Sequence, residues 1–327
     1  MKIIKCGGSS LKSYEDRKKI YQNIKSLDEK IILIVSAFAN SNYSTKSLRS
    51  LIKGNFDYYM KEQLITLGEV ISSIIVTNDL LNEYVDASLI YVNELGIYVN
   101  SNENNVEITK LDNSIIKEKI DKHKVVVIPG FIAINQDNKI VSLKENGSDL
   151  TAVIIGKMLE TNDVYLYKDV LGLSSIDPSV SSSYKLYEKV SYDNMLKIIS
   201  HGNNLIQYDA VKLAKENNIN IHILHYLNQS YETLITKVYN VKVTTFSLKD
   251  NDIYIDGYTS QEKVENILIL KDIKYDYILP SNGYIKIVTT YNNQNHIINT
   301  LHSLFLKGEL QWHFINYKLQ EMTLFSL

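Results

Sequence analysis

Short apolar runs alternate with helical patterns along the first 225 residues, and this alternation constrains the fold more than any other feature. Runs without polar alternation are typical of strands that are covered on both faces. Amphipathic patterns such as SYEDRKKIYQNIKSL and QYDAVKLAKENN separate these runs. The alternation predicts an α/β fold, an open and mostly parallel sheet sandwiched by helices. The expected strands cover residues 2–6, 30–38, 85–92, 124–134, 163–170 and 219–226.

The pattern changes after about residue 240, where apolar and polar residues alternate as in half-buried strands. VKVTTFSL, DIYIDGY, KYDYIL, YIKIVTTY and LQWHFINYKL are typical of strands, whereas KVENILILKDI and NHIINTLHSLF are typical of helices. Two β-α-β-like blocks in so short a stretch predict a small α+β module of the ferredoxin-like type. We therefore expect two domains, residues 1–228 and 240–327. The polar segment 93–115 is expected to form a hairpin or loop insertion in the first.

The charge balance argues against nucleic acid as a partner. Lys and Arg number 35 against 37 Asp and Glu, a formal net charge of −2. A surface that follows nucleic-acid phosphates needs a basic excess or a dense basic patch, so no nucleic acid is expected.

The longest apolar stretch, VVVIPGFIAI, is shorter than the ~20 residues that a membrane-spanning helix needs. The single cysteine, Cys6, and an N-terminal run too short for a signal-peptide core predict a cytoplasmic protein.

A glycine turn, KCGGSS, follows the first expected strand and precedes a helix. Such a turn lets the backbone approach a ligand closely, and its N–H groups can bind phosphate. Lys5, at the strand end, would place an ammonium group over the same point. The patterns G-x-x-x-x-G-K-[ST] and G-x-G-x-x-G are absent. The turn alone is equally compatible with a tight connection that carries an exposed lysine.

A second glycine turn, NGSDLTA at 146–152, opens another helix. Ser148 or Asp149 could stand there as an ordinary N-cap. Alternatively, Asp149 could face a phosphate site beside the helix N-terminus.

Several motifs together carry a family resemblance. In chain order they are KCGGSS, VSAFANSNYSTKSL, LGEVISS, IPGFIA, NGSDLTA, KDVLGLSSIDPSV and SYDNMLKIISHG. The ordered set, over about residues 1–225, resembles the successive motifs of aspartokinases, in the amino-acid kinase family. The remaining tail is similar to their regulatory ACT domains, although it is short for the usual tandem pair.

The resemblance implies the amino-acid kinase fold and ATP-dependent phosphorylation of the β-carboxylate of L-aspartate to 4-phospho-L-aspartate. This reaction is the first step of the lysine, threonine and methionine branch of amino-acid biosynthesis. It also implies ATP with Mg²⁺ but no metal site on the protein, a possible amino-acid effector at the ACT-like module, and a homodimer. Lys5 and Asp149 would be catalytic. ATP would contact Lys5, Gly7, Gly8, Ser9, Ser36, Lys168, Asp169, Asp177 and Pro178, and aspartate would contact Thr45, Glu69, Lys144, Gly147 and Ser148.

Glu69 has support that is independent of the resemblance. On a helix, Ile65, Glu69, Ser72 and Val76 fall on one stripe. A carboxylate in a mostly apolar stripe is costly unless it is paired, and a substrate ammonium group would pair it. The alternative is a stripe edge that is partly exposed to water.

The chain departs from the family pattern at the substrate end. The family's GRGGSD is KENGSD here, so Glu145 stands where an arginine would hold the substrate α-carboxylate, and no arginine follows Arg49. The lysine of the family's GAK stretch is Asn204, and the threonine of TDV is Lys168. Lys144 could replace the arginine after a shift of one residue. Two alternatives stay open: a kinase for another small acid, and a weakly or non-catalytic nucleotide and amino-acid sensor.

Overall fold

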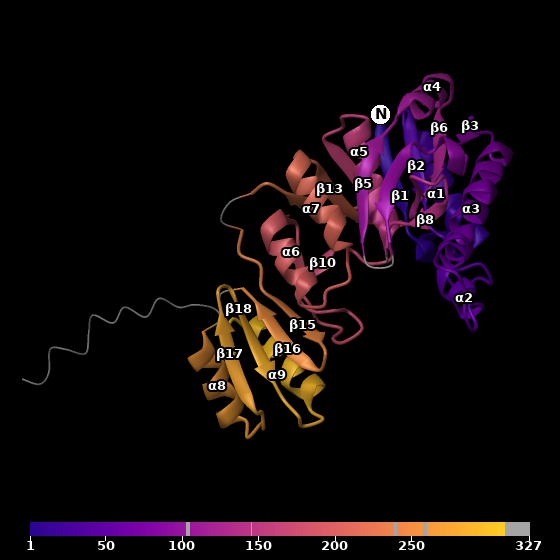
Figure 1. Ribbon diagram of the computed structural model, residues 1–327. Helices are drawn as coiled ribbons and strands as arrows, with labels where there is room; N and C mark the ends of the chain where they lie inside the picture. The colour runs from indigo at the N-terminus through magenta and orange to yellow at the C-terminus, as the bar shows by residue number, and fades with distance from the viewer. Residues whose placement is uncertain (103–104, 145, 239–240, 258–259, 311–327) are drawn as a thin grey trace, which may run out of the picture. The chain divides into compact units, whose positions relative to one another are not determined.

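The structure is a computed structural model that describes residues 1–102, 105–144, 146–238, 241–257 and 260–310 (Figure 1). The chain divides into two compact units. The first comprises Met1–Leu173 and Leu186–Val241, and the second comprises Ser174–Lys185 and Lys242–Leu327. The second unit therefore includes a short segment, 174–185, that interrupts the first unit in the sequence.

An eight-stranded sheet in the order β12-β14-β13-β9-β1-β2-β6-β3 forms the centre of the first unit. Every neighbouring pair is parallel except β13–β14, so the predicted mostly parallel α/β sheet is confirmed. The strands are β1 (Lys2–Cys6), β2 (Ile31–Val35), β3 (Ala87–Leu89), β6 (Val125–Pro129), β9 (Asp163–Lys168), β12 (Lys189–Ser191), β13 (Asn220–His225) and β14 (Glu232–Thr236).

Helices cover both faces of this sheet. Helices α1 (Tyr14–Ser26) and α3 (Tyr58–Asn82) share a buried cluster with Ile4 and Cys6 of β1. Helix α5 (Gly147–Met158) packs against β1, β2 and β9 on the side to which Lys5 points. Helix α3 is long and apolar enough to span a membrane by length and composition. However, 56% of its most apolar window is buried in the structure, as expected for a core helix.

The polar segment 93–115 contains the predicted hairpin. Its strands β4 (Ile97–Ser101) and β5 (Val106–Leu111) pair antiparallel, in a four-stranded sheet ordered β5-β4-β7-β8. The other elements of this part of the chain are η1 (Gly8–Leu11), α2 (Thr45–Ser50), η2 (Val92–Glu94), α4 (Ser114–Lys122), β7 (Ile132–Asn135), β8 (Ile140–Ser142), β10 (Leu173–Ser174), β11 (Leu186–Tyr187), α6 (Tyr192–Ser200) and α7 (Tyr208–Asn217).

The second unit is a four-stranded antiparallel sheet, ordered β15-β16-β18-β17, that shares one core with two helices. Its elements are β15 (Thr245–Lys249), β16 (Asp252–Asp256), α8 (Gln261–Leu270), β17 (Tyr277–Ser281), β18 (Tyr284–Val288) and α9 (Gln294–Leu306). The predicted small α+β module is therefore present. The further predicted strand, LQWHFINYKL, lies outside the described residues apart from its first residue, Leu310.

Segment 174–185 joins the second unit through its backbone, one buried side-chain pair and the apolar side chains of Ile176, Val180 and Tyr184. Phe246 N donates to Ser175 O at 2.8 Å, and Ile176 forms a bridge with Phe246. Ser175 Oγ lies 2.8 Å from Nε2 of the buried His302.

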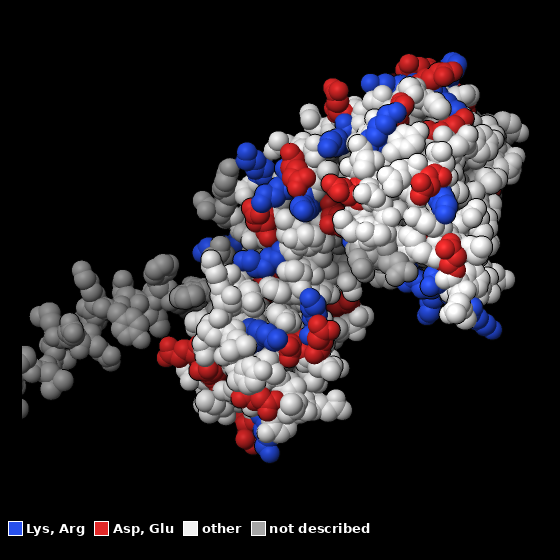
Figure 2. Space-filling model, viewed as in Figure 1, with Lys and Arg blue, Asp and Glu red and all other residues white. Residues whose placement is uncertain are grey.

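On the face shown in Figure 2, acidic and basic side chains are interspersed, in keeping with the small net charge.

Candidate functional site

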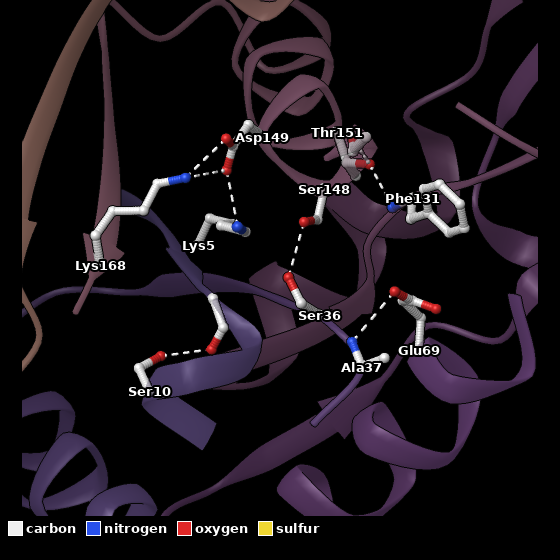
Figure 3. Close-up of polar contacts among 12 residues, drawn as sticks. Lys5, Ser10, Ser36, Ala37, Glu69, Phe131, Ser148, Asp149, Thr151 and Lys168 are labelled. Atoms are coloured by element: carbon white, nitrogen blue, oxygen red, sulfur yellow. Dashed lines mark hydrogen bonds and ion pairs between the residues drawn. The ribbon is translucent and has the colours of Figure 1, made fainter. Parts of the chain in front are cut away.

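Polar side chains gather where the parallel strands β1, β2 and β9 end. These are Lys5, near the end of β1, Ser36, directly after β2, and Lys168, the last residue of β9. The N-terminal turn of α5 meets the same edge, because Asp149 contacts both lysines and Ser148 Oγ lies 2.8 Å from Ser36 Oγ (Figure 3). Ligands of open α/β sheets bind at this edge, and helix N-termini favour anions.

Asp149 lies between two ammonium groups and is fully buried. Its Oδ1 is 2.8 Å from Lys5 Nζ, and its Oδ2 is 2.8 Å from Lys168 Nζ. Burial alone would raise the pKa of Asp149, but the charges of Lys168 and Lys5 outweigh it and lower the pKa to about 2. Burial also lowers the pKa of Lys168, which Asp149 partly restores. The structure thus brings together the two predicted catalytic residues and adds Lys168 to them.

The glycine turn after β1 is held closely against its neighbours. Gly7 N donates to Tyr167 O at 3.2 Å, so this N–H group, a predicted phosphate donor, is already bonded within the protein. Ser10 Oγ closes the turn by donating to Gly7 O at 2.7 Å, a contact that the sequence analysis missed. A Cβ on Gly8 would lie 2.4 Å from the carbonyl oxygen of Ala37, so the loop after β2 requires glycine here. At Gly7, a Cβ would lie 3.8 Å from Lys5 Nζ, and its absence leaves room beside that ammonium group.

Glu69 of α3 is buried near the same edge. Its Oε1 accepts a hydrogen bond from Ala37 N at 3.2 Å, whereas its buried Oε2 has no hydrogen-bond partner among the described residues. Burial raises the pKa of Glu69 to about 7, against the lowering effects of the Ala37 N–H, the Lys5 charge and Thr45. The prediction of a buried carboxylate is confirmed, and the stripe-edge alternative is wrong because Glu69 is only 3% exposed.

The start of α5 differs from ordinary capping. Asn146, with φ 57°, is the N-cap, so Ser148 and Asp149 lie inside the first turn and neither caps the helix. Thr151 Oγ1 accepts a hydrogen bond from Phe131 N at 2.9 Å and donates to Gly147 O at 3.0 Å. Thr151 therefore fixes the turn that carries Asp149, a role that the sequence analysis did not assign.

A second buried ion pair holds the end of η1, the short helix that follows the glycine turn. Arg17 Nε lies 2.9 Å from Asp79 Oδ2, and one of its other nitrogens donates to Leu11 O at 3.1 Å. Tyr21 OH donates to the same carboxylate at 3.1 Å. The pair joins the end of η1 to α3. The only sequence signal for it was the scarcity of arginine, because Arg17 is one of two in the chain.

The remaining predicted residues are less closely tied to this cluster. Ser9 lies in η1, and Asp169 is exposed directly after Lys168. Lys144 is exposed with φ 63°, and Glu145 lies outside the described residues. Asp177 and Pro178 are exposed in the second unit, where Asp177 Oδ1 accepts hydrogen bonds from Ser179 N and Oγ. The ligand contacts of these residues stay predictions.

Comparison with known proteins places most of the chain in one family. Residues 1–225 match the profile described as the amino acid kinase family. The chain is 27% identical to the aspartate kinase of Pseudomonas putida over 240 residues, which are 72% of this chain and 58% of that protein. It is 25% identical to aspartokinase 2 of Bacillus subtilis over 270 residues, 82% of this chain and 64% of that protein. The chain therefore spans about three fifths of the length of these relatives.

Solved structures agree at the level of the fold. E. coli aspartokinase III in complex with aspartate and ADP matches with a TM-score of 0.65 at 16% identity, over 95% of this chain and 84% of that one. UMP kinase from Ureaplasma parvum matches with a TM-score of 0.53 at 15% identity, over 72% and 97%. At such identities the likeness concerns the fold alone. The family profile, in contrast, covers the whole of the sheet-end cluster around Lys5 and Asp149, and the chain belongs to the amino acid kinase family.

Proposed function

We propose that the chain is an aspartate kinase. It transfers the terminal phosphoryl group of ATP to the β-carboxylate of L-aspartate and forms 4-phospho-L-aspartate, the first step of the lysine, threonine and methionine branch. Family membership and the curated relatives named aspartate kinase support this reaction. Its proposed location is the cytoplasm, in keeping with the single cysteine, Cys6.

The observation that carries the proposal is that two features lie near the same sheet edge: a cluster of lysine ammonium groups, and a buried carboxylate oxygen without a partner among the described residues. Lys5 and Lys168 flank Asp149 beside the N-terminus of α5, which suits the oxygens of a transferring phosphoryl group. The buried Oε2 of Glu69 has no partner among the described residues and suits the substrate ammonium group.

The chemistry needs no general base on the protein. A β-carboxylate oxygen of aspartate forms a bond to the γ-phosphorus, and the bond from that phosphorus to the bridging oxygen breaks, so ADP leaves with its electron pair. The nucleophile is already ionised at neutral pH. The site therefore contributes positioning and charge neutralisation, and Lys5 supplies positive charge where the phosphoryl oxygens pass.

Mg²⁺ fits this proposal as part of the nucleotide. Within the described ranges, no group of three or more His, Cys, Asp or Glu side chains could hold a metal ion. Both oxygens of Asp149 are already held by ammonium groups. Magnesium is commonly held by phosphates and water with few protein ligands, so it would enter with ATP and neutralise phosphate charge.

The substrate is tested by ADP release across small amino acids. We expect turnover with aspartate and a lower aspartate KM in Glu145→Arg, by about tenfold or more, because a bidentate contact replaces a like charge. Lys144→Ala is the companion variant. If Lys144 already holds the α-carboxylate, this variant loses aspartate binding and Glu145→Arg gains little.

Other outcomes of that assay favour the alternatives. Glu145 reverses the charge of the family arginine, and this favours a different small acid that carries a cationic group. Turnover of such an acid, but not of aspartate, would contradict the proposed substrate. ATP binding without any turnover would favour a nucleotide and amino-acid sensor.

The second unit completes the proposal as an ACT-like module that binds an amino-acid effector and forms a homodimer. The dimer is supported by an apolar edge, since Tyr277 and Leu279 of β17 and Ile269 and Leu270 of α8 are exposed. An edge strand with exposed apolar side chains invites pairing with a copy of itself.

We expect Leu279→Lys to convert the full-length dimer into monomer in sedimentation velocity, because a charge on the β17 edge opposes burial. Leu51→Lys, at an exposed apolar position of the first unit, is the matched control and should remain dimeric. A wild-type chain that is monomeric at high concentration would contradict the dimer.

A further inference from the structure

Helix α3 has a second apolar face, on the side opposite Glu69. Its large apolar side chains there recur at every seventh residue, and each is 40–62% exposed: Met60, Leu67, Ile74 and Leu81. Leu64 and Ile71 lie between them and are partly exposed. The spacings of four and three residues keep these six side chains on one side of the helix, and we call this set the outer stripe.

The exposure of the outer stripe is unusual for a helix whose other side is already buried. A surface helix normally presents charged and polar residues to water. Every residue of α3 is described, and none of its exposed residues is charged. The helix lies at the outer edge of the first unit in Figure 1, where the surface in Figure 2 is mostly white. An uncovered apolar face of this kind marks an interaction surface.

The dimensions of the outer stripe fit a second copy of the same helix. Helix α3 has 25 residues and is therefore about 37 Å long, so a stripe about 10 Å wide along it covers on the order of 400 Å². Two such stripes would bury about 800 Å² together, which is the size of a weak and reversible interface. The spacing also suits self-association, because side chains that repeat at four and three residues fit between those of an identical helix.

The charges at the ends of α3 favour an antiparallel pair. Lys61 lies near the helix N-terminus, and Glu83 is the C-cap at the other end. In an antiparallel pair, Lys61 of each copy approaches the C-terminal turn and Glu83 of the other, and the two helix dipoles attract each other. A parallel pair would bring like ends together. The end charges are therefore complementary only in the antiparallel arrangement.

We propose that the outer stripe is a second self-association surface, at which two copies of the chain pack their α3 helices antiparallel about a two-fold axis near Ile71. This surface is separate from the β17 edge of the second unit. Two different two-fold interfaces on one chain join dimers into a closed tetramer. Glu69 lies on the opposite face of α3, so the inference does not depend on the substrate or on the reaction.

Cross-linking tests the arrangement directly. Cys6 is the single cysteine and is fully buried, so a thiol placed on the outer stripe is the accessible one. In the antiparallel pair, Met60 of one copy lies beside Leu81 of the other, whereas the two Met60 positions are roughly 30 Å apart. We expect a short bismaleimide to join full-length Met60→Cys to Leu81→Cys in a mixture, and to join neither variant to itself. Self cross-linking of each variant without the mixed product would overturn the antiparallel pair.

Sedimentation equilibrium over a concentration series measures the strength of the surface. Wild type should show an association step beyond the β17 dimer, and Ile74→Glu should raise the Kd of that step about 100-fold or more, because each pair would then bury two like charges. Tyr208→Glu, at an exposed position of α7, is the matched control and should associate like wild type. Leu279→Lys acts on the β17 edge alone, so failure of that dimer and failure of the α3 pair give different results.

Three further results would overturn the α3 pair. The first is a wild-type chain that stops at the dimer at every concentration and gives no cross-link between the two cysteine variants. The second is association that Ile74→Glu leaves unchanged, which would belong to another surface. The third is sedimentation of the full-length chain with vesicles of phosphatidylcholine and phosphatidylglycerol, lost in Ile74→Glu and without self-association, which would show that the outer stripe faces a membrane instead.

Discussion

Lys5→Met is expected to lower kcat by about 10³-fold while the fold stays intact. The Lys5 ammonium lies at the sheet edge, 2.8 Å from Asp149 and above the turn at Gly7. Charge on the transferring phosphoryl oxygens is stabilised mainly by such fixed cations, and loss of one costs about 10²–10⁵-fold in rate. The stem of methionine fills most of the lysine volume. Steady-state ADP release gives the rate, and circular dichroism with thermal melting reports the fold.

Substitution of Lys5 tests catalysis more clearly than substitution of Asp149, because it leaves no buried charge without a partner. Without Lys5, Lys168 still pairs with Asp149, and no buried charge is left alone. Without Asp149, two buried ammonium groups would face each other, and an uncompensated buried charge costs about 3–5 kcal/mol of stability. Lys2→Met is the matched control, since Lys2 lies on the same strand and stacks over the ring of Tyr165 at 4.0 Å. A kcat for Lys5→Met within a few-fold of wild type would remove Lys5 from the catalytic residues.

The sheet could be predicted because its signal is local. Every residue of β2 and β6 is buried, so each strand appears in the sequence as an unbroken apolar run. The place of segment 174–185 could not be predicted, because its attachment depends on contacts with Phe246 and His302, far along the chain. Nor does the sequence indicate that β13 and β14 pair antiparallel within a mostly parallel sheet.

In the site too, local sequence patterns locate some residues, whereas other contacts depend on tertiary structure. The glycine turns and the stripe around Glu69 are local patterns, and they located Lys5, Asp149 and Glu69. The ion pair of Lys168 depends on β9 lying beside β1, which no spacing in the sequence indicates. The alternative that Ser148 or Asp149 is an ordinary N-cap was wrong, because the helix already begins at Gly147, after a left-handed Asn146.

Glu69→Gln is expected to weaken amino-acid binding and stabilise the fold at the same time. If the free Oε2 binds the substrate ammonium group, its replacement leaves that charge unpaired, and the amino-acid KM should rise about 10²- to 10³-fold. Glu62→Gln is the matched control. Glu62 lies two turns earlier on α3 and accepts a hydrogen bond from Ser142 N, an interaction that glutamine can also make, so its KM should not change.

The stability effect follows from the pKa of Glu69. Burial raises that pKa from 4.5 to about 7, so the folded protein holds this proton more tightly than the unfolded chain. Wild-type stability should therefore fall as the pH rises from about 4.5 to 7 and stay lower above it, by roughly 3 kcal/mol at ~1.4 kcal/mol for each unit of pKa. The Glu69→Gln variant should not show this fall in stability, because glutamine has no proton to release in this pH range. Urea unfolding at pH 5 and pH 8 should show similar stabilities at pH 5 and a more stable variant at pH 8.

The pH dependence of substrate binding has the opposite direction, and this separates a binding role from a structural one. The ammonium group needs ionised Glu69, so the wild-type amino-acid KM should rise as the pH falls below about 7, where the carboxyl group takes up its proton. In Glu69→Gln this part of the pH profile should disappear. A variant that gains stability at pH 8 but keeps the wild-type KM and pH profile would show that Glu69 is only a buried carboxyl group. The same measurement on Glu62→Gln should reproduce the wild-type profile, so that a general effect of charge on α3 is excluded.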